Sequence, residues 1–303
     1  MPSKTVFVTI AGRANAGKSS LLNELVGEKI AMVSDKPQTT RTKITGILTK
    51  GDIQYVFMDT PGIQKAKNKL GEHMNKTVRD SITGIDCIIY VFDCTKKINE
   101  GDMMMIRAFS DSGENVILVL SKTDLVKDKS VVAERIAEFS QLYDFAAVVP
   151  TSIPRHEGIE ELMGEVTAFA QDGPHYFPDD SVTDQPERVI MAEIIREKLL
   201  LLMYDEVPHG VAVGIESLNE SVTTAGEDIL NIDAVIYCEK DSHKGMIIGK
   251  GGSMLKNAGR LAREELESFF RIKVNLKLWV KVKEDWRNRE GLIRNFGLSN
   301  DGK

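Results

Sequence analysis

The stretch Gly12-Arg-Ala-Asn-Ala-Gly-Lys-Ser19 satisfies the pattern G-x-x-x-x-G-K-[ST] of a phosphate-binding loop. The apolar run Thr5–Ile10 before it predicts a strand, and the periodic segment Ser19–Val26 after it predicts a helix, which is the setting that the pattern requires. Glycines allow backbone N–H groups to approach phosphates closely, and the start of the helix adds the positive end of its dipole. The sequence therefore predicts a nucleotide site rather than a structural glycine turn.

Two side chains of this loop have predicted roles. We expect Lys18 to neutralise the β- and γ-phosphates of the nucleotide, and the hydroxyl of Ser19 to bind Mg²⁺. The other positions expected to contact the nucleotide are Gly12, Arg13, Asn15, Ala16, Gly17 and Ser20.

A second motif, Asp59-Thr-Pro-Gly62, follows an apolar run of strand length. A carboxylate at a strand end can hold Mg²⁺ through water, and the N–H of Gly62 can reach the γ-phosphate. Of the adjacent Thr39 and Thr40 we favour Thr40, whose hydroxyl can complete the Mg²⁺ shell only while the γ-phosphate is present. This predicts a nucleotide-dependent switch loop, with Lys18, Thr40 and Gly62 as the catalytic set.

The base is predicted by Ser121-Lys-Thr-Asp124, which stands where a guanine-binding N-K-x-D motif is expected. Asp124 can accept two hydrogen bonds from N1–H and the exocyclic amine of guanine, a pair that adenine does not offer. Lys122 can lay its stem along the base plane, whereas serine at 121 is shorter than asparagine and is expected to weaken the brace to the phosphate loop. In Pro150-Thr-Ser-Ile153, Ser152 and Ile153 are expected to support guanine O6 through backbone N–H groups.

Short apolar runs alternate with helix-like segments between residues 5 and 170, which predicts a mainly parallel sheet with helices on both faces. Residues 171–187 are rich in Pro, Asp and Gly and predict a linker. The order then changes to helix, two strands, two helices and a strand. We therefore predict an α/β P-loop GTPase domain over residues 1–171, a linker over 172–186, and an α+β KH domain of type II over 187–303.

The turn Gly249-Lys-Gly-Gly252 satisfies the G-x-x-G pattern of a KH domain, which clamps single-stranded RNA. The segment from Lys244 to Arg294 carries 13 Lys and Arg against 6 Asp and Glu, although the whole chain has a net charge of −6. A basic segment on an acidic chain indicates a polyanionic partner. The residues expected to contact RNA are Ile247, Ile248, Gly249, Lys250, Gly251, Gly252 and Lys256.

The bulk composition predicts a cytoplasmic protein. No apolar stretch approaches the roughly 20 residues of a membrane span. The three cysteines cannot all pair. Cys87 and Cys94 bracket one apolar run and Cys238 ends another, so we expect reduced core residues.

Taken together, the motifs resemble those of the Era family of GTPases over nearly the whole chain. The resemblance is carried by Arg13 and Asn15 in the loop, Gln38-Thr-Thr-Arg41, Asp59-Thr-Pro-Gly62, and the second-domain segments Glu193–Lys198 and Asp205–His209. It implies GTP and GDP as ligands, binding of 16S ribosomal RNA near its 3′ end, and a role in maturing the 30S ribosomal subunit. It also implies peripheral membrane association, although the Leu199–Met203 run is expected to pack against the KH sheet. We expect a monomer.

The resemblance also bears on hydrolysis. Ile63 stands where Ras-like enzymes have the glutamine that orients water, which predicts slow intrinsic turnover. Related GTPases with asparagine at the position of Asn15 use it to hold K⁺, so Asn15 is the candidate ligand of a potassium ion.

Two alternatives remain open from the sequence. One is a KH RNA-binding protein whose altered guanine loops, at Ser121 and Ile153, have weakened nucleotide binding. The other is a GTPase that modifies tRNA or moves metal ions, which would need a cysteine or metal cluster or membrane helices.

Overall fold

The structure is a computed structural model that describes residues 3–33, 40–62, 68–81, 85–203, 210–224, 226–296 and 298. The chain divides into two compact units, the first made of Met1–Lys67 and Gly71–Asp184, the second of Asn68–Leu70 and Gln185–Lys303. Of the residues discussed above, Gln38, Thr39, Ile63 and the segment 205–209 lie outside the described parts.

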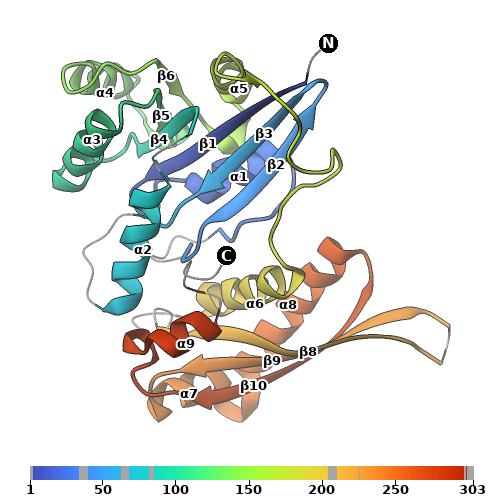
Figure 1. Ribbon diagram of the computed structural model, residues 1–303. Coiled ribbons are helices and arrows are strands. Elements are labelled where there is room, and N and C mark those ends of the chain that lie inside the picture. Colours follow the sequence, from blue (N-terminus) through green and yellow to red (C-terminus); the bar gives the residue numbers. More distant parts are fainter. Residues whose placement is uncertain are drawn as a thin grey trace. The chain divides into compact units, whose positions relative to one another are not determined.

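The first unit is built on a sheet with the strand order β2-β3-β1-β4-β5-β6 (Figure 1). All pairs along this path are parallel except β2 with β3, which are antiparallel. The strands are β1 (Lys4–Gly12), β2 (Ile44–Lys50), β3 (Ile53–Asp59), β4 (Cys87–Asp93), β5 (Val116–Ser121) and β6 (Ala147–Pro150). β2 lies at one end of this strand order and is an edge strand.

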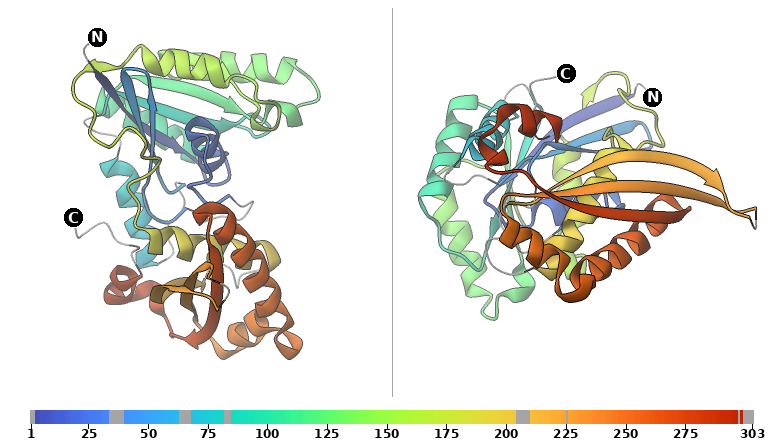
Figure 2. Two further views of the ribbon diagram at one scale, coloured as in Figure 1. Left: turned by 90° about the vertical axis from the view of Figure 1, so that its right-hand side faces the viewer. Right: turned by 90° about the horizontal axis from the view of Figure 1, so that it is seen from below.

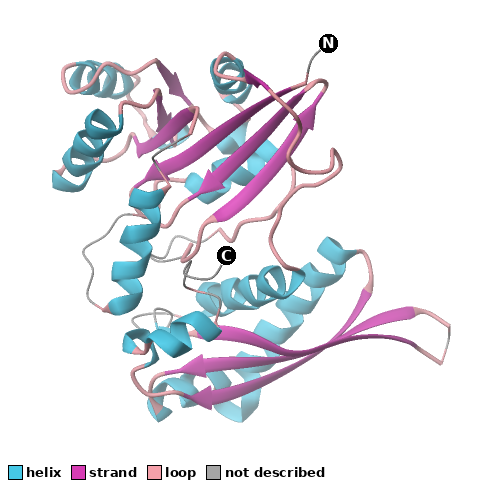
Figure 3. Ribbon diagram, viewed as in Figure 1, coloured by secondary structure: helices cyan, strands magenta, loops and turns pink. Residues whose placement is uncertain are grey.

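Helices cover both faces of this sheet, so each face buries its own apolar core (Figures 1 and 3). On one face α1 and α5 pack their leucines and valines against alternate residues of β1, β4 and β5. On the other, Phe109 of α3 and Phe139 of α4 pack around Tyr90 of β4 with edge-to-face ring contacts. The helices are α1 (Lys18–Val26), α2 (Lys69–Asp80), α3 (Glu100–Ser112), α4 (Ser130–Ser140) and α5 (Ile159–Thr167). The predicted α/β class of this domain is confirmed.

Residues 171–184, assigned from composition to a linker, are attached to the first unit. The short strand β7 (Gln171–Asp172) pairs with β1. The buried amide of Gln54 then accepts from the N–H groups of Tyr176 and Phe177 and donates to the Phe177 carbonyl. Further on, Val182 accepts a hydrogen bond from the N–H of Ile47 on the edge strand β2. This segment is therefore an ordered strap along the sheet.

The second unit has the KH order of elements, with a three-stranded sheet β10-β9-β8 (Figures 1 and 2). β10 runs parallel to β9, and β8 antiparallel to it. Leucines and isoleucines of α6, α7 and α8 pack on one face of this sheet and form its core. The elements are α6 (Glu187–Leu202), β8 (Ala212–Val222), β9 (Asp228–Cys238), α7 (Asp241–Ile248), α8 (Ser253–Phe270), β10 (Lys273–Val282) and α9 (Glu290–Asn295).

Two predictions about the core are confirmed. Cys87, Cys94 and Cys238 are all buried free thiols. Leu199 and Met203 pack in the core under the KH sheet, as expected. Across the described ranges, no helix is long and apolar enough to cross a membrane.

Candidate functional site

The phosphate loop connects the end of β1 to the start of α1, and its backbone is held in conformations that favour glycine. Gly12 and Gly17 have φ of 149° and 103°, and Asn15, at φ 64°, is also left-handed. A Cβ on Gly12 would lie 2.4 Å from the carbonyl oxygen of Val91, so β4 approaches the loop too closely for any side chain there. The sequence requirement for glycine therefore follows from local packing as well as from phosphate access.

Lys18 is the first residue of α1 and is almost completely buried. Its Nζ donates to the carbonyl oxygen of Arg13, 3.0 Å away across the loop. Burial lowers the pKa of Lys18, and the nearby Asp59 carboxylate opposes that shift. An anion inside the loop would stabilise the charged ammonium group in the same way, which is the role expected of a phosphate.

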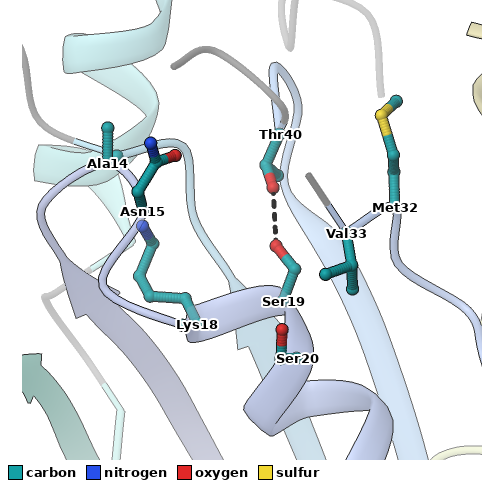
Figure 4. A pocket seen from close by; sticks show the side chains of 10 residues that line it. Ala14, Asn15, Lys18, Ser19, Ser20, Met32, Val33 and Thr40 are labelled. Atoms are coloured by element: carbon teal, nitrogen blue, oxygen red, sulfur yellow. Dashed lines mark hydrogen bonds between the residues drawn. The ribbon is translucent and has the colours of Figure 1, made fainter. Parts of the chain in front are cut away.

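Three oxygens converge beside this lysine. The hydroxyl of Ser19 lies 2.8 Å from the hydroxyl of Thr40 (Figure 4). Ser19 also donates to Asp59 Oδ2 at 2.6 Å, and the distance from the Thr40 hydroxyl to Asp59 Oδ2 is 3.4 Å. Ser19, Thr40 and Asp59 come from α1, the segment before β2 and the end of β3, so the fold assembles residues that are far apart in the sequence.

This cluster fits a hard divalent cation. The second oxygen of Asp59, Oδ1, is buried and has no hydrogen-bond partner among the residues that the structure describes. Burial raises the pKa of Asp59, although Lys18, Ser19 and Thr40 each oppose the increase. A carboxylate and two hydroxyls are the oxygen donors that Mg²⁺ prefers, and the cation would stabilise the ionised carboxylate.

A hollow opens at the loop, and Lys18, Ser19 and Thr40 line it. Figure 4 shows Asn15, Lys18, Ser19, Ser20 and Thr40 around it. Gly62 lies against the loop, because a Cβ there would be 2.6 Å from both the N and the Cα of Ala14. The structure thus brings together the predicted catalytic set of Lys18, Thr40 and Gly62 at one pocket.

The predicted base loops also meet each other. Ser152 donates to Asp124 Oδ1 at 2.9 Å, and Thr123 donates to the carbonyl oxygen of Thr151 at 3.0 Å. Ser152 thereby orients the carboxylate that we expect to bind guanine, a role that the sequence did not indicate. Ile153 packs its side chain on the core below α1, which leaves its backbone as the part available to a ligand.

Serine at 121 forms the brace to the phosphate loop despite its short side chain. Its hydroxyl, which is buried, lies 2.6 Å from the Ala16 carbonyl oxygen and 3.1 Å from that of Phe92. The expectation that serine weakens this brace is therefore not supported by the geometry. Lys122 adds a second link, since its Nζ donates to the Asn15 carbonyl at 2.6 Å.

Sequence reasoning missed Asp93, which holds Lys122 in place. Asp93 Oδ2 accepts from Lys122 Nζ at 2.8 Å, while its Oδ1 accepts from the N–H and hydroxyl of Thr95. Burial acts to raise the pKa of Asp93, but these hydrogen bonds outweigh it and the pKa is lowered. The signal available in the sequence was a carboxylate directly after the buried run Cys87–Phe92.

Two residues predicted to contact ligands have other neighbours in the structure. The side chain of Arg13, expected at the nucleotide, extends instead to Asp102 of α3, with Nη1 3.4 Å from Oδ2. Ile247, expected to line an RNA groove, is completely buried in the core of the second unit. It occupies an inward position of α7, where it supports the turn from below.

The G-x-x-G turn follows α7, with Gly249, Gly251 and Gly252 all at positive φ. Gly249 is packed tightly on Met254, whereas no atom of the described residues lies within 4 Å of a Cβ on Gly251 or Gly252, so this backbone is open to a ligand. A groove continues from the turn along α8, lined by exposed Lys256, Arg260 and Arg263, and by Leu276 and Leu278 of β10. Of the predicted RNA-contacting residues, Lys256 and Gly252 line this groove.

Comparisons with known proteins agree with both halves of this description. Residues 7–122 match a family model described as 50S ribosome-binding GTPase, and residues 206–287 match one described as KH domain. GTPase Era of Clostridioides difficile (strain 630) is 46% identical over 296 residues, which cover 98% of this chain and 99% of the relative. GTPase Era of Caldanaerobacter subterraneus subsp. tengcongensis is 46% identical over 301 residues, covering 99% and 100%.

Solved structures give the same result. Era in complex with MgGDPNP and nucleotides 1506–1542 of 16S ribosomal RNA is 34% identical to this chain, with a TM-score of 0.93 over 98% of this chain and 99% of the other. An Aquifex aeolicus Era variant bound to GDP·AlF4⁻ matches equally, at 34% identity, a TM-score of 0.93 and the same coverage. With its phosphate loop, its KH unit and full-length relatives, the chain belongs to the Era family of GTPases.

Proposed function

We propose that this protein is a Mg²⁺-dependent GTPase switch that binds single-stranded RNA at the 3′ end of 16S ribosomal RNA and assists biogenesis of the 30S subunit. The observation that carries the proposal is the presence, in one chain, of a buried phosphate and cation pocket and a basic G-x-x-G groove. A monomeric, cytoplasmic protein is part of the proposal.

In the nucleotide pocket, Lys18 and the N–H groups of the loop bind the β- and γ-phosphates, aided by the N-terminus of α1. Ser19, Thr40 and Asp59 are the residues that would hold Mg²⁺, which when bound neutralises charge on the phosphate oxygens. Gly62 offers its N–H to the γ-phosphate from beside the loop. These groups lower the barrier by positioning and by electrostatic stabilisation, the main sources of catalysis in phosphoryl transfer.

Guanine is selected by Asp124, which Ser152 holds in orientation. The carboxylate accepts hydrogen bonds from N1–H and the exocyclic amine, whereas adenine would leave it unpaired in the base site. Lys122, fixed by Asp93, supports the base through its stem and the phosphate loop through its ammonium group.

The RNA half of the proposal rests on the groove along α8 and on the relative that was solved with a 16S RNA fragment. Lys250 and Lys256 carry charge for the phosphates, and the open glycines at 251 and 252 allow the RNA backbone to approach closely. Leu276 and Leu278 give the groove an apolar wall on which bases can lie.

A titration of labelled GTP, GDP and ATP, with Mg²⁺ and with EDTA, tests the nucleotide half. We expect GTP and GDP to bind and ATP to bind at least about 100-fold more weakly, because of the unpaired carboxylate at Asp124. The Asp124→Asn variant should lose much of this preference. If wild-type protein binds neither GTP nor GDP while it binds RNA, the rival reading as a KH protein with decayed nucleotide binding is correct.

Potassium dependence is a second prediction. Asn15 is held in a left-handed conformation at the rim of the pocket, where its side chain can help to bind a monovalent cation near the phosphates. A potassium ion there would supply the positive charge that an arginine finger supplies in other GTPases. Steady-state GTP hydrolysis should therefore be at least roughly tenfold faster in KCl than in NaCl at equal ionic strength. The Asn15→Ala variant should lose the difference. Equal rates in both salts for the wild type would contradict a potassium site.

RNA binding should be weaker and less salt-dependent in Lys256→Ala and Arg263→Ala. Each side chain is exposed on the groove side of α8, so removal of one phosphate contact lowers the slope of log K against log salt by about one. Fluorescence anisotropy with a single-stranded oligonucleotide of the 16S 3′ end gives both quantities. Lys127→Ala, an exposed lysine of the first unit, is the matched control and should leave the slope unchanged.

A further inference from the structure

We propose that Arg13 is a positioning residue that holds the phosphate loop through Asp102, and that it does not bind phosphate. The inference rests on the proposed function in one respect, that this loop receives the phosphates of a guanine nucleotide. It concerns a contact between the loop and Asp102 of α3.

The anchor for Arg13 is a rigid carboxylate. Asp102 has no exposed surface, and its Oδ1 accepts from the hydroxyl of Tyr90 at 2.7 Å. Its Oδ2 accepts from the backbone N–H of Asn99 at 2.9 Å, as part of a capping box at the start of α3. Since β4 and the α3 N-terminus both fix this carboxylate, it can orient a cationic side chain that pairs with it.

Arg13 is the cation that does so. Its Nη1 lies 3.4 Å from Asp102 Oδ2, and its side chain is 35% exposed, whereas the carboxylate is fully covered. Arg13 also supplies the carbonyl oxygen that accepts from Lys18 Nζ. The contact of the Arg13 side chain with Asp102 therefore also fixes the carbonyl oxygen that Lys18 binds.

The loop packs closely on β4 at Gly12, where a Cβ would lie 2.4 Å from the carbonyl oxygen of Val91. Beside Arg13–Ala16 there is an open hollow, which Val91–Asp93 at the end of β4 also line. Two charged links fix this part of the loop. One is Arg13 with Asp102, and the other is Lys122, which binds the Asn15 carbonyl and Asp93.

The loop backbone would relax toward the hollow if a link were lost. Asn15, whose carbonyl oxygen Lys122 binds, holds a left-handed conformation, which asparagine tolerates better than most other non-glycine residues. Such a conformation depends on the surroundings that fix the loop, and without Arg13 the N–H groups would no longer converge on the phosphates.

The competing interpretation, in which Arg13 binds phosphate, predicts the opposite effect of removing the Asp102 charge. If Arg13 could swing round to bind phosphate, Asp102 would compete for it, and removing the carboxylate charge would strengthen nucleotide binding. If Arg13 acts through Asp102, removing either partner weakens binding, and removing both is no worse than removing one.

The test is a double-mutant cycle on the full chain, with GDP and GMP binding measured by calorimetry in Mg²⁺. Arg13→Gln and Asp102→Asn should each weaken GDP binding about tenfold, a size typical of coupled contacting residues, and the double variant should match the weaker single variant. Arg13→Lys should recover part of the loss. GMP, which has one phosphate for the loop to hold, should be affected less than GDP.

Thermal unfolding of the nucleotide-free variants separates positioning from a general loss of stability. Tyr90→Phe removes one hydrogen bond from the same carboxylate while leaving Arg13 paired, so it should lower the unfolding temperature with a smaller loss of GDP affinity. If Asp102→Asn does not fold, Arg13→Gln and Arg13→Lys carry the test alone.

Two results would overturn the inference. One is unchanged GDP binding in Arg13→Gln, and the other is tighter GDP binding in Asp102→Asn. Failure of the wild type to bind GDP would instead contradict the proposed function, and is distinguished by the wild-type titration in the same experiment.

Discussion

The burial of Asp59 beside Lys18 and Ser19 is the constraint on which the first unit depends. A carboxylate and an ammonium group are both nearly excluded from water, and one oxygen of the carboxylate has no hydrogen-bond partner within the described part of the chain. Burial lowers the pKa of Lys18 and raises the pKa of Asp59, and both changes favour the neutral form of the group. Such a pair is costly to a fold unless ligand charges complete it, so the pocket is complementary to an anion next to a divalent cation.

The sheet explains how one pocket collects residues from most of the domain. Parallel strands present their carboxyl ends at one edge, where ligands bind in open α/β sheets. β1 leads into the phosphate loop, β3 ends on Asp59, β4 on Asp93 and β5 on Ser121. Hydrogen bonds between neighbouring strand ends, such as Ser121 to the Ala16 carbonyl, then join the separate motifs into one rigid frame.

The sequence predicted those parts of the site that are encoded locally. Lys18, Ser19, Asp59 and Asp124 each follow a strand within a recognisable spacing. The structure places Asp59 at the end of β3, Lys18 and Ser19 at the start of α1, and Asp124 in the turn after β5. Contacts between residues far apart in the sequence could not be predicted in this way. No local pattern near Arg13 indicates that its guanidinium meets Asp102, 89 positions away. The burial of Ile247 was not predicted for a related reason, because one apolar residue beside a glycine turn fits a core position and a groove equally well. The strap at 171–184 was taken for a linker because its order comes from the distant Gln54, not from local periodicity.

The most direct test of the account is the Mg²⁺ dependence of nucleotide binding in Asp59→Asn. Calorimetry of a non-hydrolysable GTP analogue, with Mg²⁺ and with EDTA, should show that the wild type gains affinity from Mg²⁺ and that the variant gains almost none. Binding of GDP in EDTA should persist in the variant, because the loop and Lys18 are unchanged. A full Mg²⁺ effect in Asp59→Asn would contradict the assignment of the buried carboxylate as the centre of the site.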